Sequence, residues 1–242
     1  NTQPSGAGAS RLVCGSHPGH VELEQRLAEF KQTEAALSFS SGYACAVGVL
    51  QALLQKGDVV ILDKLSHASL IDGARLSGAT LRVFPHNDVD KLDSHLRWAR
   101  EKIDPRSGRV LVVTESVFSM DGDRAPLRKI VELKERHGAL LLLDEAHAFG
   151  MIGPGGRGLA AELELADRVD LHLGTLSKAA GLSGGFIAGS RDFIDLCVQR
   201  ARSFIYSTAP PPPLAAAAAR SLEIIGGAEG DTLRERLWRN LS

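Results

Sequence analysis

A lysine that follows a predicted buried strand has the clearest capacity for chemistry in this sequence. Residues 171–175 form a short apolar segment, and Lys178 stands three positions beyond it, at the end of the run Gly-Thr-Leu-Ser-Lys. Burial removes the hydration of an ammonium group and lowers its pKa, so that the neutral amine becomes available. A neutral amine can form a Schiff base with an aldehyde such as pyridoxal 5'-phosphate (PLP). The alternative is a lysine whose amine simply reaches solvent at the strand end.

A second motif, Asp144-Glu145-Ala146-His147, follows the most apolar segment of the chain, at residues 139–143. A buried carboxylate is costly unless it meets a cation, and a protonated pyridine nitrogen is such a partner. At about 3 Å the attraction is about 5 kcal/mol for an effective dielectric constant of about 20, part of which desolvation removes. The pair would keep the ring protonated and able to accept electrons from a carbanion. Asp-x-x-His could instead be half of a metal site, but no second His or Cys cluster has ligand spacing, so we expect no metal.

A third motif, Ser41-Gly42-Tyr43, stands between a predicted strand at residues 36–39 and a predicted helix. Free backbone N–H groups and the positive end of the helix dipole favour an anion at such a position. Gly42 would let the backbone approach a phosphate closely. The alternative is an ordinary serine N-cap of the helix.

Two further side chains could touch a bound aromatic ring. His20 opens a predicted helix after a glycine-rich stretch, and stacking of its imidazole would contribute roughly 0.5–1.5 kcal/mol. Ser119 follows a predicted strand at residues 109–115, where its hydroxyl could hydrogen-bond a ring substituent. The alternatives are an exposed histidine in a first helical turn and a serine that closes an Asp-Gly turn. His67 and His86 are assigned to a helix start and to a turn.

Apolar segments alternate with helical patterns along most of the chain. Strands are predicted at residues 36–39, 59–62, 80–84, 109–115, 139–143, 171–175 and 185–188. Helices are predicted at residues 20–31, 40–54, 67–76, 89–100, 127–137, 191–201, 214–225 and 231–240, with a break at prolines 210–213. The alternation predicts an α/β fold, a mostly parallel sheet with helices on both faces, which binds ligands at the carboxyl ends of its strands. Four ionisable residues fall near these ends: Asp63, Glu115, Asp144 and Lys178.

Composition excludes several classes of protein. The chain has 242 residues, 44% of them hydrophobic and 24% charged, which is enough for one large domain with a full core. A formal net charge of -1 gives no reason to expect nucleic acid or a membrane surface as partner. No apolar run approaches the roughly 20 residues of a membrane span, and no basic-then-apolar signal segment begins the sequence. Three distant cysteines without a CxxC pair favour a reducing compartment, so we expect a soluble cytoplasmic protein.

Six segments, taken together, resemble the α-oxoamine synthases, which are PLP enzymes of the aspartate-aminotransferase fold. They are residues 19–24, 41–43, 66–69, 117–123, 144–147 and 174–178, and they run in family order along nearly the whole chain. The resemblance implies a three-layer PLP-binding large domain at residues 21–208. Residues 1–20 would be a loop that continues from a missing N-terminal segment. Residues 209–242 would be the helical start of a truncated C-terminal small domain.

The resemblance also implies a role for each matching residue. Lys178 would carry the cofactor and move the substrate α-proton, while Asp144 would pair with the pyridine nitrogen. His147 would hydrogen-bond the ring oxygen, and His20 would stack on the ring. The phosphate would be held by the following residues: Gly42, Tyr43, Ser119 and Thr175. Thr208 lies in a segment similar to one that reaches the phosphate of the neighbouring subunit, which implies a homodimer with shared sites.

The implied reaction is a decarboxylative condensation of an amino acid with an acyl thioester. Residues 86–89 and 122–127 most resemble the family member that joins L-alanine to a pimeloyl thioester, on CoA or a carrier protein, in biotin synthesis. The shared motifs leave open the same chemistry on glycine with acetyl-CoA, or on serine with a long acyl-CoA.

Two departures from the family pattern also leave a non-catalytic reading open. Ala46 stands where family members commonly place an asparagine, and the arginine expected to hold the substrate carboxylate lies in the missing C-terminal part. A non-catalytic scaffold should have lost Lys178 or Asp144, and both are present, although the chain as it stands could be an inactive fragment.

Overall fold

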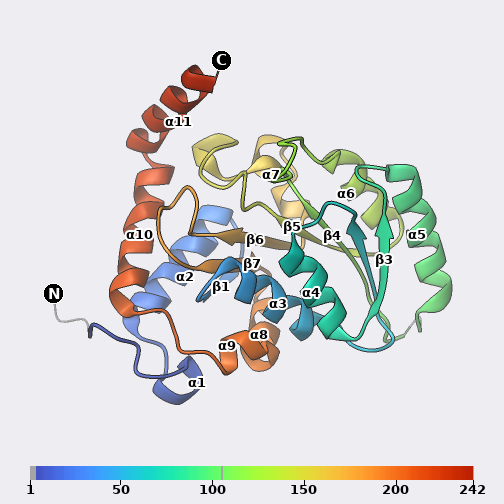
Figure 1. Cartoon of the computed structure of the whole chain (residues 1–242), viewed down its shortest axis with the longest axis horizontal. Helices are drawn as coiled ribbons and strands as arrows, with labels where there is room; N and C mark the ends of the chain where they lie inside the picture. Colours follow the sequence, from blue (N-terminus) through green and yellow to red (C-terminus); the bar gives the residue numbers. More distant parts are fainter. Residues whose placement is uncertain (1–3, 105, 242) are drawn as a thin grey trace.

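Seven strands form one twisted sheet in the part of the chain that the computed structural model describes, residues 4–104 and 106–241 (Figure 1). The strands are β1 (Ala35–Phe39), β2 (Val59–Asp63), β3 (Thr80–Phe84), β4 (Val110–Glu115), β5 (Leu140–Asp144), β6 (Leu171–Thr175) and β7 (Gly185–Gly189). Their order across the sheet is β1-β7-β6-β5-β4-β2-β3. Neighbours pair in parallel except at β7, which is antiparallel to both β1 and β6. The predicted mostly parallel sheet is confirmed.

The longer helices lie where the hydrophobic periodicity predicts them. They are α2 (Pro18–Lys31), α3 (Gly42–Leu53), α4 (Ala68–Ser77), α5 (Val89–Lys102), α6 (Leu127–Arg136), α8 (Arg191–Arg200), α10 (Pro212–Gly226) and α11 (Ala228–Leu241). The sequence did not predict three four-residue helices, α1 (Arg11–Cys14), α7 (Leu159–Glu162) and α9 (Arg202–Ile205), or the 3₁₀ turns Pro154–Gly156 and Ala166–Arg168. None of the described helices is long and apolar enough to cross a membrane.

Two predictions about irregular segments are wrong. The predicted loop at residues 1–20 contains α1 and the first turn of α2, and its residues 1–3 lie outside the described part of the chain. The predicted break is present between α9 and α10, but the helix after it was predicted from residue 214 and α10 begins at Pro212, with Pro211 as its N-cap. A proline in the first helical turn loses no hydrogen bond, since the N–H groups there have no partner within the helix.

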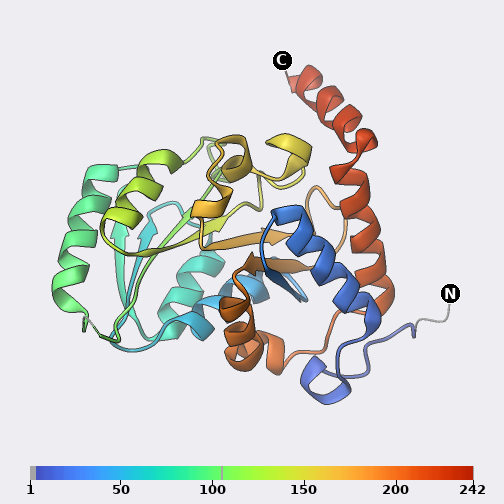
Figure 2. The ribbon, with the colours of Figure 1, turned by 180° about the vertical axis from the view of Figure 1, so that it is seen from behind.

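Helices cover the sheet on both faces, which gives three layers (Figures 1 and 2). On one face α3, α4 and α8 pack on strand residues such as Leu62, Val113 and Leu142. On the other face α5 and α6 cover the β3 side of the sheet, and α2 with α10 cover the β1 side. The strands β2, β4 and β5 are buried on both faces, which explains why their sequences are apolar without alternation. Helix α11 extends away from this body at the end of the described chain (Figure 1).

Candidate active site

A cavity of about 240 Å³ opens at the carboxyl ends of the central strands. Its wall comes from the end of β4 and from the segments that end or follow β1, β2, β5 and β6, which the parallel topology brings to one edge of the sheet. The residues that line it are Ser41, Gly42, Tyr43, His67, Ser69, Glu115, Asp144, Ala146, His147, Leu173, Thr175, Ser177 and Lys178. Six of the predicted site residues therefore meet in one place: Gly42, Tyr43, Asp144, His147, Thr175 and Lys178.

Lys178 lies on the short connection between β6 and the antiparallel strand β7. Two backbone hydrogen bonds close this connection, from Leu176 N to Gly184 O at 3.0 Å and from Leu182 N to Leu176 O at 2.9 Å. The sequence predicts a buried amine, but the Lys178 residue is exposed, because it stands beyond the end of the strand on the rim of the cavity. Its Nζ donates to Nε2 of His147 at 2.7 Å.

The surroundings of Lys178 favour a neutral amine. Partial desolvation lowers the pKa of Lys178, and the carboxyl groups of Asp144 and Glu115 oppose that change. Desolvation and the neighbouring Lys178 charge also lower the pKa of His147, which leaves its imidazole free to accept a hydrogen bond. An amine and an imidazole in direct contact can pass one proton between them and to a bound molecule.

Asp144 ends β5 and is buried, with only 6% of its surface exposed. One carboxyl oxygen, Oδ1, accepts the backbone N–H of Ala146 at 2.9 Å. Burial raises the pKa of Asp144 to about 6, although this hydrogen bond and the charge of Lys178 favour the ionised form. The group is therefore a buried carboxyl on a cavity wall that would gain from a cation beside it.

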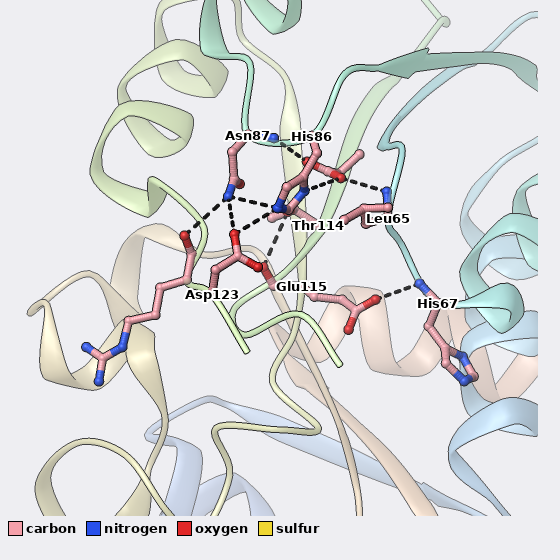
Figure 3. Close-up of polar contacts among 9 residues, drawn as sticks. Leu65, His67, His86, Asn87, Thr114, Glu115 and Asp123 are labelled. Atoms are coloured by element: carbon pink, nitrogen blue, oxygen red, sulfur yellow. Dashed lines mark hydrogen bonds and ion pairs between the residues drawn. The ribbon is translucent and has the colours of Figure 1, made fainter. Parts of the chain in front are cut away.

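Glu115 is a site residue to which the sequence assigns no role. It ends β4 and stands opposite Asp144 in the β4–β5 register. Its Oε1 accepts the backbone N–H of His67 at 2.6 Å, a contact that links the loop after β2 to the end of β4 (Figure 3). Burial, followed by the repulsion of Asp144, raises the pKa of Glu115 to about 7. Sequence reasoning could have identified Glu115 as a site residue, because it stands at the carboxyl end of a predicted strand, as Asp144 does.

Directly behind Asp144, a buried ion pair secures the end of β5. Glu145 is paired with Lys31 from α2, and its Oε2 also contacts Nδ1 of His172 at 3.2 Å. Oε1 accepts the backbone N–H of Ala160 at 3.1 Å. Burial alone would raise the pKa of Glu145, but Lys31 and His172 outweigh it and lower the pKa to about 2. These contacts from three directions fix the backbone from which Asp144 and His147 project.

The N-terminus of α3 forms a close-packed corner of the cavity. Ser41 caps the helix, because its Oγ accepts the N–H of Ala44 at 3.0 Å. Gly42 packs against Thr175, and a Cβ atom on Gly42 would stand 3.2 Å from both Cβ and Oγ1 of that threonine. The Tyr43 hydroxyl donates to Asp72 at 2.8 Å, and Tyr43 also lines the cavity wall. The corner therefore combines an ordinary serine cap with a helix N-terminus, Gly42 and Tyr43, on the cavity wall.

Three predicted site residues do not line the cavity. His20 is the third residue of α2 instead of its first, because His17 is the N-cap and Pro18 starts the helix. It is 2% exposed, and its Nε2 donates to the carbonyl of Pro210 at 2.7 Å. Ser119 and Thr208 are exposed on the turns that follow β4 and α9. The imidazole that does line the cavity beside His147 is that of His67, which sequence reasoning assigned to a helix start.

Comparisons with known proteins agree on one family. A model described as aminotransferase class I and II matches residues 1–242. The 8-amino-7-oxononanoate synthase of Pelobacter propionicus is 50% identical over 238 residues, which are 98% of this chain and 60% of that protein. A serine palmitoyltransferase from S. paucimobilis with a bound PLP–myriocin aldimine superposes with a TM-score of 0.91 and 38% identity, over 98% of this chain and 59% of that chain.

A second solved structure is similar at lower identity. An 8-amino-7-oxononanoate synthase from Francisella tularensis superposes with a TM-score of 0.79 and 27% identity, over 99% of this chain and 72% of that chain. The chain described here thus spans about 60% of the length of the curated relative from P. propionicus.

Proposed function

Because this chain belongs to the aminotransferase class I and II family, we propose that it is the cofactor-binding part of a PLP-dependent α-oxoamine synthase. The names of two similar proteins give the product of the proposed reaction as 8-amino-7-oxononanoate. From the resemblance of residues 86–89 and 122–127, we propose that the substrates are L-alanine and a pimeloyl thioester, which condense with loss of carbon dioxide in biotin synthesis. One observation carries the proposal. The amine of Lys178 and the buried carboxyl of Asp144 line the same cavity, and the pKa of the lysine is lowered while that of the aspartic acid is raised.

The residues of the cavity fit PLP in three respects. Asp144 is a buried carboxyl that a protonated pyridine nitrogen would stabilise. Lys178 offers an amine with a lowered pKa to the aldehyde. Gly42, with Thr175 packed against it, leaves the α3 backbone bare toward a phosphate group, as a side chain there would not. When bound, PLP supplies an aldehyde for the substrate amine and an electron-accepting ring.

The residues of the chain would then hold the reactants and move one proton. The neutral Lys178 Nζ can take the proton from the substrate α-carbon and return it. Nε2 of His147, which contacts Lys178 at 2.7 Å, would instead carry a proton and donate it in a hydrogen bond to the ring oxygen. The carboxylate of Asp144 would stabilise the proton on the pyridine nitrogen of the cofactor. His67 lines the cavity, so we assign to it the stacking role that the sequence gave to His20.

The spectrum of the purified chain with added PLP tests the cofactor assignment. We expect a visible Schiff-base band in the wild type that Lys178→Ala lacks. Lys91→Ala serves as the matched control, because Lys91 is exposed on α5 and would report the reaction of PLP with surface amines. A folded wild-type chain without the band, or a Lys178→Ala chain that keeps it, would contradict the proposal.

Product analysis tests the substrates. A chain extended to the full length of its relatives would be given L-alanine, glycine or serine, each with pimeloyl-CoA, a pimeloyl carrier protein, acetyl-CoA or a long acyl-CoA. We expect amino ketone from alanine with a pimeloyl donor. Serine with a long acyl donor is the second candidate, because the serine palmitoyltransferase superposes with a TM-score of 0.91. Product from serine alone would replace the proposed function with that one.

We also infer a homodimer in the cytoplasm. Thr208 is exposed and outside the cavity of its own chain, as expected if it reaches the site of a second subunit. The cysteines Cys14, Cys45 and Cys197 are free thiols, as expected for a reducing compartment. Equilibrium sedimentation of the full-length protein would test the dimer, and a monomer with full activity would contradict the shared site.

A further inference from the structure

A histidine clamped between two carboxylates lies beside the active site and plays no part in the chemistry proposed above. His86, on the turn after β3, contacts Asp63 through Nδ1 at 2.9 Å and Asp123 through Nε2 at 2.8 Å (Figure 3). We call these three side chains the histidine clamp. The edge of the imidazole also meets the ring of Phe118, with 4.4 Å between ring centroids.

The geometry of the histidine clamp favours a charged imidazole. Each ring nitrogen has a carboxylate oxygen as its nearest partner, and because a carboxylate accepts hydrogen bonds, both nitrogens donate. The Asn87 side-chain amide also lies 3.2 Å from Nε2, but it donates to Asp123 at the shorter distance of 2.8 Å. Partial burial lowers the pKa of His86, but the hydrogen bonds to Asp63 and Asp123 and their charges outweigh it, and the pKa is raised. These two carboxylates are the charged groups that face the ring, since the neighbouring Arg124 is paired with Glu162 instead.

The histidine clamp joins the loop after β2, whose His67 lines the cavity, to the turn after β4. Asp63 ends β2, and its Oδ1 also accepts the N–H of Leu65, at 2.8 Å. Two residues further on, the N–H of His67 is held by Glu115 at 2.6 Å. Asp123 lies on the turn after β4, where its carbonyl accepts the N–H of Phe118 at 3.0 Å.

Asn87 adds a second tie between the same loops. Its backbone N–H donates to Asp63 Oδ2 and its side-chain amide donates to Asp123 Oδ2, both at 2.8 Å. The loop after β3 therefore holds both carboxylates at once, while the imidazole carries the positive charge that keeps the two acids together.

We propose that His86, as an imidazolium, is a positioning residue that fixes the loop bearing His67 against the rest of the cavity. The effect on cofactor affinity rests on the proposed function, whereas the effect on the loop does not. The sign follows from the raised pKa: the ion pairs are complete below the ordinary histidine pKa of about 6.5 and are lost as pH rises through the higher pKa of the folded state. The loop after β2 should therefore loosen in mildly alkaline solution.

The first test needs no cofactor. Amide signals of Leu65, His67 and Asn87 would be followed by NMR from pH 6 to pH 9 in the wild type and in His86→Gln. We expect the wild-type amides to shift, and to exchange with solvent faster, at the pKa of the His86 ring itself. The variant should show fast exchange at every pH. His137→Gln is the matched control, because His137, the C-cap of α6, also contacts a carboxylate, Asp93 on α5, at 2.7 Å.

The second test measures the dissociation constant of PLP across the same pH range. The ratio of the variant to the wild-type constant should be about fivefold at pH 6 and should approach one as the wild-type imidazole loses its proton. Titration of Lys178 or His147 is common to both proteins and cancels in this ratio. Asp123→Asn, at a partly exposed position, gives the same comparison if His86→Gln does not fold.

The outcomes separate this proposal from the proposed function. Absence of PLP binding in the wild type, with amides that follow the His86 titration, would refute the function and leave the positioning role supported. Amides of Leu65 and His67 that are unchanged in His86→Gln would overturn the positioning role, whatever the cofactor does. A PLP ratio that is the same at every pH would also overturn it, because a purely structural loss has no reason to follow the charge of the ring.

Discussion

Replacing the buried acid at the centre of the site should make the cofactor-free chain more stable. Burial raises the pKa of Asp144 from 3.8 to about 6, so the folded chain keeps this proton to a higher pH than the unfolded chain does. Stability therefore falls as pH rises between these two values and stays lower above them. The change in pKa corresponds to about 3 kcal/mol at neutral pH.

The substitution Asp144→Asn removes this cost and keeps the one hydrogen bond, because an amide oxygen can still accept the N–H of Ala146. We expect the free energy of unfolding without PLP to rise by up to about 3 kcal/mol at pH 7 and by much less at pH 4. Urea unfolding followed by circular dichroism at both pH values measures the difference. PLP affinity of the variant should fall, because the ring nitrogen loses its anionic partner.

A matched aspartate should respond in the opposite direction. Asp170, immediately before β6, also accepts a backbone N–H, from Leu141 at 2.8 Å, but it is paired with Lys134 at 2.9 Å. Asp170→Asn removes a stabilising charge pair and should lower the free energy of unfolding at pH 7. If Asp144→Asn lowers it as well, or raises it equally at pH 4 and pH 7, the account of Asp144 as an unpaired buried acid is wrong.

Two further substitutions test the surroundings of the site. Lys31→Met leaves the Glu145 carboxylate buried and unpaired, so unfolding in urea at pH 7 should become easier by about 3–5 kcal/mol, and adding Glu145→Gln should recover most of the loss. Because the pKa of Glu145 is lowered from 4.5 to about 2, the contribution of the pair should fade as pH falls through that range, and a loss at pH 7 of under about 1 kcal/mol would contradict it. Gly42→Ala brings a methyl group within 3.2 Å of Thr175, and absorbance titration should find PLP binding weaker by about tenfold, equivalent to about 1.4 kcal/mol. Unchanged affinity in that variant would contradict the role of this corner in holding the phosphate.

Strand positions could be predicted because the central strands are apolar throughout and are separated by amphipathic helices. The edge strand β3 was also predicted, although it is partly exposed; it contains β-branched and aromatic residues, which favour strands. The helices α1, α7 and α9 were missed because four residues make little more than one turn, which is too short for a 3.6-residue period to appear. The start of α10 was missed because a proline run was taken as a break, although prolines are tolerated in a first helical turn.

The site could be predicted in so far as its residues end parallel strands. Asp144 and Lys178 needed only the rule that such ends meet at one edge of the sheet. The two histidines His20 and His67 look alike in sequence, since each stands near a helix start after a loop. Only the strand order separates them: His67 follows β2, a neighbour of β4, whereas His20 lies on α2, which covers a face of the sheet.

The antiparallel strand β7 affects when the site is completed as the chain folds. It pairs with β6 across a short connection, but it also pairs with β1, from which most of the chain separates it. The first residue of β7, Gly185, lies so close to Gly42 that an added Cβ would stand 2.6 Å from the Cα of that glycine. Closing so long a loop is slow compared with local pairing. During synthesis on the ribosome, the corner of the cavity at Gly42 should therefore emerge early and stay incomplete until β7 pairs with β1. Binding of PLP would then report the last step of folding.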